Sequence, residues 1–123
     1  MSRFSSSTIM ELLDAFQFTT HAQIGDFVTR FELEEADNQG MLNPRRRGIV
    51  TYLIDHPDKR GPFGANVIVE IIEYLLEIQC RFSDPEEKFP RLVRALKRDG
   101  YVVQDGKLKT TLPADVQLAA TED

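Results

Sequence analysis

The sequence has little of the chemistry on which small catalytic domains depend. Its 123 residues include no tryptophan, one cysteine (Cys80) and two histidines (His21 and His56). A single cysteine excludes an internal disulfide framework and a cysteine-rich zinc site. Neither histidine has a second histidine, a cysteine or a carboxylate at a metal-ligand spacing such as H-x-x-x-H. We therefore predict no metal site, no cofactor and no catalytic residues, and expect a protein that is not an enzyme.

Long apolar runs are also missing. Runs such as Val67-Ile68-Val69 have three residues, whereas a membrane helix needs roughly 20. The first residues, Met1 to Phe4, lack the charged-then-apolar plan of a signal peptide. Hydrophobic residues make up 41% of the chain and charged residues 28%, which are ordinary globular values. We expect a soluble cytoplasmic protein of about one domain, with no membrane partner.

Charge is distributed unevenly along the chain, which has a net charge of −5. The net charge is −5 over residues 1–42, +3 over 43–64, −4 over 65–90, +4 over 91–112 and −3 over 113–123. The overall acidity disfavours a general nucleic-acid binder, which needs excess Lys and Arg to neutralise phosphates. The alternation would suit self-association or an oppositely charged partner, and a mixed solvated surface is the alternative.

Apolar residues at i, i+3, i+4 and i+7 predict two short helices near the start of the chain. The first is expected to begin at Thr8, whose hydroxyl and Glu11 would form a capping box. The second is expected to begin at Thr20, with Gln23 in the same capping position. A tight connection between these helices predicts that they pack as a hairpin.

Two further helices are predicted in the middle of the chain. Asn43 before Pro44 is a favourable helix start, and this third helix should end before Pro57. A fourth helix, over about residues 65–81, has a wide aliphatic face that predicts the centre of the core. Its other side is expected to be solvated, with Glu77 and Arg81 as a surface pair; the acidic residues of that side are Glu70, Glu73 and Glu77.

The last elements are a basic helix over about residues 89–99 and a hairpin over 101–110. Asp105-Gly106 supplies the positive φ angles that a type I′ turn needs. Residues 83–88 are expected to interrupt the helices. The predicted fold is mainly α, a compact bundle of about five helices with a small C-terminal β-hairpin. We predict a disordered N-terminus over residues 1–7, a single domain over 8–113 and a tail or linker over 114–123.

The basic helix and the hairpin together resemble the recognition helix and wing of winged-helix DNA-binding domains. In that arrangement helix residues would meet the major groove or the phosphates, and two lysines of the hairpin would follow the backbone. The six side chains of this candidate interaction or nucleic-acid surface are Arg91, Arg94, Lys97, Arg98, Lys107 and Lys109. The separation over residues 83–88 exceeds the turn of three or four residues typical of the motif.

A second candidate surface is the loop that precedes the fourth helix. Lys59 and Arg60, followed by Gly61, open a loop before a helix N-terminus, where free N–H groups favour anions. The segment lacks the Gly-Lys-Ser/Thr end of a phosphate loop. We therefore weigh an anion-binding loop against a purely structural turn.

Three runs together resemble the N-terminal domain of AbiJ-type abortive-infection proteins. They are Tyr-Leu-Ile-Asp-His-Pro at 52–57, Arg-Gly-Pro at 60–62, and the run at 96–108 that contains Asp-Gly-Tyr-Val and Asp-Gly-Lys-Leu. The resemblance spans roughly residues 8–113. It implies a non-enzymatic sensor, adaptor or self-association domain in antiphage defence that precedes an effector, often a HEPN-type domain associated with RNA cleavage. Expected partners are a protein or such an effector domain, with a homo-oligomer and nucleic acid as alternatives.

Overall fold

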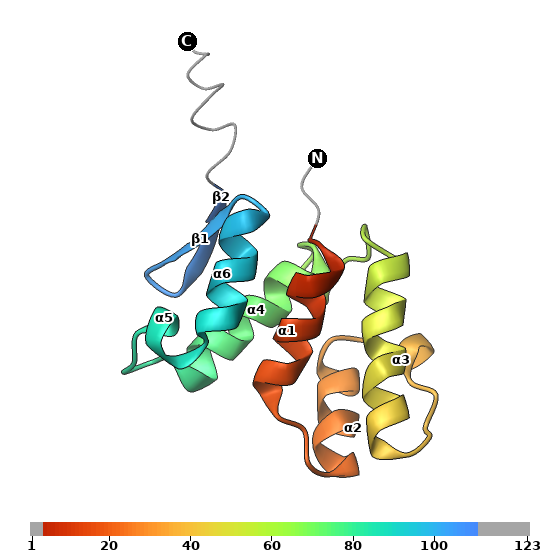
Figure 1. The fold of residues 1–123 in the computed structure, drawn as a ribbon. Coiled ribbons are helices and arrows are strands. Elements are labelled where there is room, and N and C mark those ends of the chain that lie inside the picture. Colours follow the sequence, from red (N-terminus) through yellow and green to blue (C-terminus); the bar gives the residue numbers. More distant parts are fainter. Residues whose placement is uncertain (1–3, 111–123) are drawn as a thin grey trace.

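The computed structural model describes residues 4–110, which form a helical bundle closed by a two-stranded antiparallel hairpin (Figure 1). The mainly helical fold predicted from the sequence is confirmed. The elements are, in chain order, α1 (Ser6–Phe16), α2 (His21–Arg30), the 3-10 helix η1 (Glu34–Ala36), α3 (Leu42–Asp55), α4 (Val67–Gln79), α5 (Pro85–Lys88), α6 (Pro90–Arg98), β1 (Tyr101–Gln104) and β2 (Lys107–Thr110).

Helix α4 supplies the centre of the core, as its aliphatic pattern predicts. Ile68, Ile71, Ile72 and Leu75 are almost completely buried. Helices α1 and α3 pack against each other, α1 also packs on α4 and α6, and β2 lies against α4. Other fully buried side chains come from the flanking elements: Ile9, Leu12, Leu13, Ile24, Leu33, Ile49, Leu53 and Leu96.

Helix α1 begins three residues earlier than predicted, because Thr8 is not its N-cap. Ser5 is the N-cap, and its side chain accepts a hydrogen bond from the Thr8 N–H. Thr8 is completely buried, and its hydroxyl donates to Asp99 Oδ2 at 2.6 Å. The same oxygen accepts from the Ser5 N–H and hydroxyl at 2.9 and 3.2 Å. The Thr8 hydroxyl, which the local motif predicts to cap the helix, therefore bonds instead to Asp99, a residue distant in the sequence.

The segment predicted to be a disordered N-terminus is partly structured. Its last two residues, Ser6 and Ser7, belong to α1. Phe4 stacks on Tyr101, with ring centroids 4.6 Å apart. The predicted tail, residues 114–123, lies outside the described residues, as do residues 1–3 and 111–113.

The middle helices have slightly different ends from those predicted. Helix α3 begins at Leu42 with Met41 as its N-cap, so Asn43 does not cap it. Pro44 is tolerated because it lies in the first turn, where a backbone N–H has no partner within the helix. Helix α4 is shorter than the predicted 65–81, because Asn66 caps its start by accepting from the Ile68 N–H. The predicted end of α3 before Pro57 is correct.

The hairpin forms at the predicted turn. Val103 pairs with Leu108 across the strands, and Asp105 and Gly106 have φ angles of 53° and 75°. Gly100, with φ 94°, ends the turn after α6. The segment 83–88, predicted as an interruption, contains the single-turn helix α5.

Helices α1 and α2 do not pair along their lengths as a hairpin. Helix α1 packs mainly on α6 and α3. It meets α2 at one end, where the ring of Phe16 lies 5.1 Å from that of Phe27. Phe18, in the connection, also contacts Phe27 at 5.2 Å. The aromatic side chains thus join the two helices at their turn, and the aliphatic face of α1 is used on the rest of the bundle.

We predict that Asp99→Ala destabilises the fold by about 1–3 kcal/mol, because it removes the acceptor of three hydrogen bonds, one of them from a buried hydroxyl. Urea unfolding followed by circular dichroism measures the change. Asp58→Ala is the control, because Asp58 is exposed and has no hydrogen-bond partner among the described residues; its effect should stay within about 0.5 kcal/mol. Equal effects of the two variants would contradict the assigned role of Asp99.

Candidate functional site

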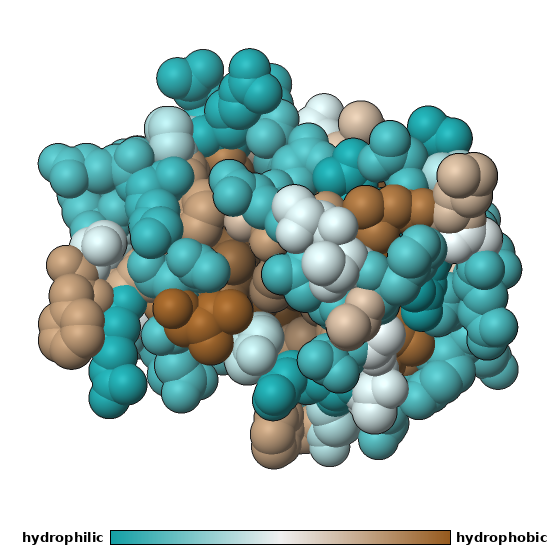
Figure 2. All heavy atoms as spheres, turned by 90° about the horizontal axis from the view of Figure 1, so that it is seen from below, coloured by the Kyte–Doolittle hydropathy of each residue, from teal (hydrophilic) through white to brown (hydrophobic). Residues whose placement is uncertain are grey.

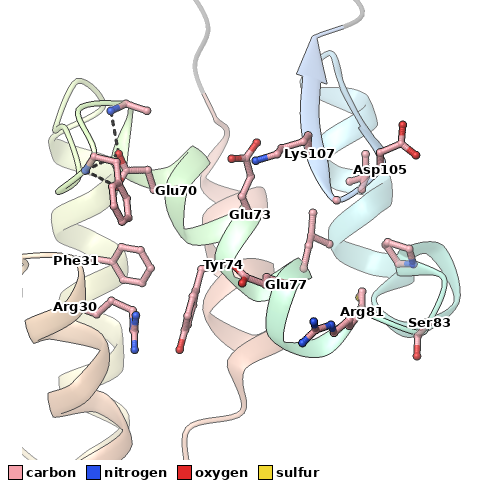
Figure 3. A pocket seen from close by; sticks show the side chains of 17 residues that line it. Arg30, Phe31, Glu70, Glu73, Tyr74, Glu77, Arg81, Ser83, Asp105 and Lys107 are labelled. Carbon is pink, nitrogen blue, oxygen red and sulfur yellow. Dashed lines mark hydrogen bonds between the residues drawn. The ribbon is translucent and has the colours of Figure 1, made fainter.

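A groove of about 970 Å³ follows the open face of α4. Arg30 of α2 and its C-cap Phe31 border it on one side, and the β1–β2 turn and the loop after α4 border it on the other (Figure 3). The side chains that α4 and its C-cap contribute to the groove are Glu70, Glu73, Tyr74, Leu76, Glu77 and Cys80. The groove therefore combines aromatic rings with charges of both signs.

A second hollow adjoins the first and shares Arg30, Phe63 and Tyr74 with it. Its lining includes Ile78 and the aromatic side chains where α1 meets α2. The view from below shows apolar surface exposed in hollows between hydrophilic side chains (Figure 2). Phe63 and Ile78, which line these hollows, are exposed by 88% and 47%. Phe82, which follows the lining residue Arg81, is exposed by 94%.

Glu70 holds the loop that presents Phe63. Its carboxylate is buried and accepts hydrogen bonds from the Phe63 N–H at 3.2 Å and the Ala65 N–H at 2.9 Å (Figure 3). A Cβ on Gly61 would lie 2.1 Å from the Glu70 carboxylate, so the loop can close in this form only with glycine there. The predicted solvated face of α4 is thus wrong at Glu70. The exposed Phe63 ring therefore belongs to a loop whose backbone is held by hydrogen bonds to the buried Glu70 carboxylate.

The same contacts bear on the candidate anion-binding loop. Two of its backbone N–H groups donate to Glu70. The guanidinium of Arg60 donates to the carbonyl of Gly64 within the loop, and the Lys59 carbonyl accepts from the Val67 N–H. The loop's N–H donors therefore already bind the negative charge of Glu70, which belongs to α4. This favours a structural turn over an anion-binding loop.

The two other glutamates of α4 have different surroundings. Glu73 accepts a hydrogen bond from the Leu108 N–H at 3.1 Å and so joins α4 to β2. Glu77 is exposed. The predicted Glu77–Arg81 pair is absent from the ion pairs of the described residues. Arg81 instead lies over the Phe82 ring, 5.9 Å from its centroid.

All six basic side chains of the predicted interaction surface are exposed. Lys97 forms an ion pair with Glu86 at 2.5 Å. Lys107 lines the groove and points toward Glu73 (Figure 3). Within residues 4–110, no ion pair holds the remaining four: Arg91, Arg94, Arg98 and Lys109. The structure thus separates Lys107, which faces the groove, from the stripe of arginines on α6.

Several titratable groups outside the groove have structural partners. Arg45 donates to both carboxylate oxygens of Asp37, at 2.7 and 2.8 Å, and to the backbone carbonyl of His21. This hydrogen bonding holds the pKa of Asp37 below its ordinary value, against the opposing effect of burial. His56 stacks on Tyr52, and burial raises the pKa of Cys80. In the described part of the chain no three His, Cys, Asp or Glu side chains gather as metal ligands.

Comparisons of the chain with models of protein families, with curated proteins and with solved structures found no match. Within the described residues, no helix has the length and apolar character that crossing a membrane requires. The groove itself was not foreseen from the sequence. One signal was available: Phe63 and Phe82 lie outside the apolar helical periodicity, so no predicted helix face accounts for their burial.

We predict that Gly61→Ala destabilises the fold by about 1–3 kcal/mol, because the new methyl group displaces the Glu70 carboxylate from its two donors. In a Glu70→Ala background the same substitution should cost much less, since the oxygen that it would strike is gone. A double-mutant cycle by urea unfolding measures this coupling. Additive effects of the two changes would show that Gly61 and Glu70 act independently.

Proposed function

We propose that this chain is a non-enzymatic protein-interaction domain of a regulatory kind, which binds its partner along the open face of α4. The observation that carries the proposal is the exposure of Phe63 and Phe82 beside a groove of mixed polarity. Large aromatic side chains are enriched among the residues that dominate binding energy at interfaces. A binding surface would also explain why Glu70 holds a loop from which the Phe63 ring projects into solvent.

The groove is better suited to a polypeptide than to a reaction. It is lined by aromatic rings, three basic side chains and several carboxylates, and the described part of this lining contains no histidine. Glu70 and Glu73 already accept backbone hydrogen bonds, so they serve the architecture. A peptide or protein surface offers the apolar side chains and charges of both signs that such a lining would complement.

The biological setting follows from the sequence resemblance to AbiJ-type N-terminal domains. It implies a sensor or adaptor in bacterial abortive infection, normally joined to an effector domain. The described structure gives the motif residues physical roles that are compatible with that proposal: Asp99 and Tyr101 anchor the start of α1, and Gly61 makes room for Glu70. These roles concern the fold, and the defence function itself rests on the resemblance.

We predict that a photo-crosslinking amino acid, benzoylphenylalanine, captures a partner protein from position 63 or 82 in cells that make the chain. The same group at position 47 should capture far less, because Arg47 is exposed on α3 and does not line either hollow. Mass spectrometry of the adducts identifies the partner. Equal capture from all three positions, or capture from position 47 alone, would contradict binding at this surface.

A second candidate function is nucleic-acid binding by α6 with the hairpin. The observation that favours it is that Arg91, Arg94 and Arg98 lie exposed on one helix without an ion pair in the described residues. Free guanidinium groups can bind phosphates in a bidentate manner. Two features weigh against it: the helix before α6 has only four residues, and Lys107 faces the groove.

For this second candidate we predict that a fluorescently labelled DNA duplex binds at micromolar protein, with an affinity that falls steeply as salt rises. The double variant Arg94→Glu/Arg98→Glu should abolish the anisotropy change, and Arg47→Glu should preserve most of it. Absence of binding at low salt removes DNA as a ligand of α6.

A further inference from the structure

We propose that the acidic segment over residues 111–123 binds the exposed arginines of α6 in the same chain and thereby shields them from other anions. The inference concerns a surface other than the groove on α4, so it is independent of the proposed function. It assigns a role to the opposite charges at this end of the sequence, which are +4 over residues 91–112 and −3 over 113–123.

The surface in question is a stripe of three arginines on α6. Arg91, Arg94 and Arg98 stand at i, i+3 and i+7, so they share one side of the helix. All three are exposed, and none has an ion pair among the described residues. Arg94 and Arg98 are four residues apart, a spacing at which like charges repel. An anion along this side would relieve a repulsion that no described ion pair compensates.

The arginines of α3 do not offer a comparable stripe. Arg45 binds Asp37 at 2.7 Å, and Arg46 lies 3.7 Å from Asp14. Arg47 is exposed, but its two neighbours in the sequence are this paired arginine and a glycine. The stripe on α6 is therefore a stronger attractor for a negatively charged segment than α3 is.

The segment that follows the hairpin has the complementary charge. Residues 111–123 lie outside the described residues, so their contribution is argued from the sequence. They include Asp115, Glu122 and Asp123 and contain no lysine, arginine or histidine. Three carboxylates thus match the three arginines of the stripe in number, which favours this segment as the occupant.

The path of the chain brings the segment to the stripe. Thr110 pairs with Tyr101 across the hairpin, and Tyr101 comes three residues after Arg98. The segment therefore starts close to the C-terminal end of α6. From Arg91 to Arg98 the stripe is about 10 Å long. Five extended residues reach about 17 Å, and the whole segment reaches about 43 Å, so both ends of the stripe are within its range.

The expected contact is weak and reversible. An exposed ion pair contributes little on its own, because solvent and salt screen it. A short tether raises the effective concentration of the carboxylates to the order of millimolar, so several weak pairs can still form at low salt. The contact should disappear as the Debye length falls with rising salt. A polyanion such as DNA would compete with the segment for the same guanidinium groups.

Paramagnetic NMR of the whole 123-residue chain tests the inference. A nitroxide is attached at Ala120→Cys in a Cys80→Ser background. At about 20 mM salt, amide signals over residues 91–98 should be weakened at least about twofold more than in a matched chain with Asp115→Asn, Glu122→Gln and Asp123→Asn. The matched chain has the same tether and label, so the difference isolates charge.

Three further readouts accompany this comparison. The extra weakening should vanish at about 0.5 M salt. The amide signal of Arg47 should not differ between the two chains, because the contact is expected on α6. Circular dichroism checks that each variant is folded.

A charge exchange separates a specific contact from general attraction. Arg94→Glu/Arg98→Glu should abolish the extra weakening, and adding Asp115→Lys, Glu122→Lys and Asp123→Lys should restore it. Equal weakening in the natural and the neutralised chain overturns the inference, as does a charge-exchanged chain without restored weakening. Equal affinity of both chains for a DNA duplex would refute the shielding. None of these outcomes alters crosslinking from positions 63 and 82, which tests the proposed function separately.

Discussion

The structure depends on one constraint, the burial of α4. Ile68, Ile71, Ile72 and Leu75 must be covered on several sides at once, and helix α1 and strand β2 both pack against this helix. Its side with Glu73, Tyr74 and Glu77 lines the groove. The groove is therefore a consequence of how the core is built, because the surrounding elements leave that side of α4 uncovered.

The polar contacts that close the fold join segments far apart in the chain. Asp99, at the end of α6, accepts hydrogen bonds from Ser5 and Thr8 at the start of α1. Glu70 plays a comparable role for the loop before α4. Both carboxylates satisfy N–H or O–H donors at a helix start or loop that would otherwise lack an acceptor. The Asp-Gly-Tyr run and the Arg-Gly-Pro loop, which carry the family resemblance, thereby have structural roles in this chain.

The interaction role that we propose rests on the exposed aromatic side chains and on the charged side chains without an ion pair among the described residues. Phe63 lines a groove in which Glu77 and Arg81 have no ion-pair partner among the described residues, and the exposed Phe82 follows Arg81 in the chain. The Arg30 guanidinium lies 4.5 Å from the centroid of the Tyr74 ring, and the Arg81 guanidinium lies 5.9 Å from the centroid of the Phe82 ring. Such a surface would complement the polypeptide partner that we propose.

The sequence by itself determined the local elements of this protein, because helix periodicity, the Thr20–Gln23 capping box and the Asp105–Gly106 turn are short-range effects. It predicted the helical bundle, the hairpin and the central place of α4. Only the tertiary structure decided which polar side chains turn inward and which apolar ones stay outside. The Thr8 hydroxyl donates to Asp99 instead of capping α1, and the Glu70 carboxylate lies against the loop at Gly61 instead of facing solvent. These choices depend on residues tens of positions away or on loop closure, which periodicity does not encode.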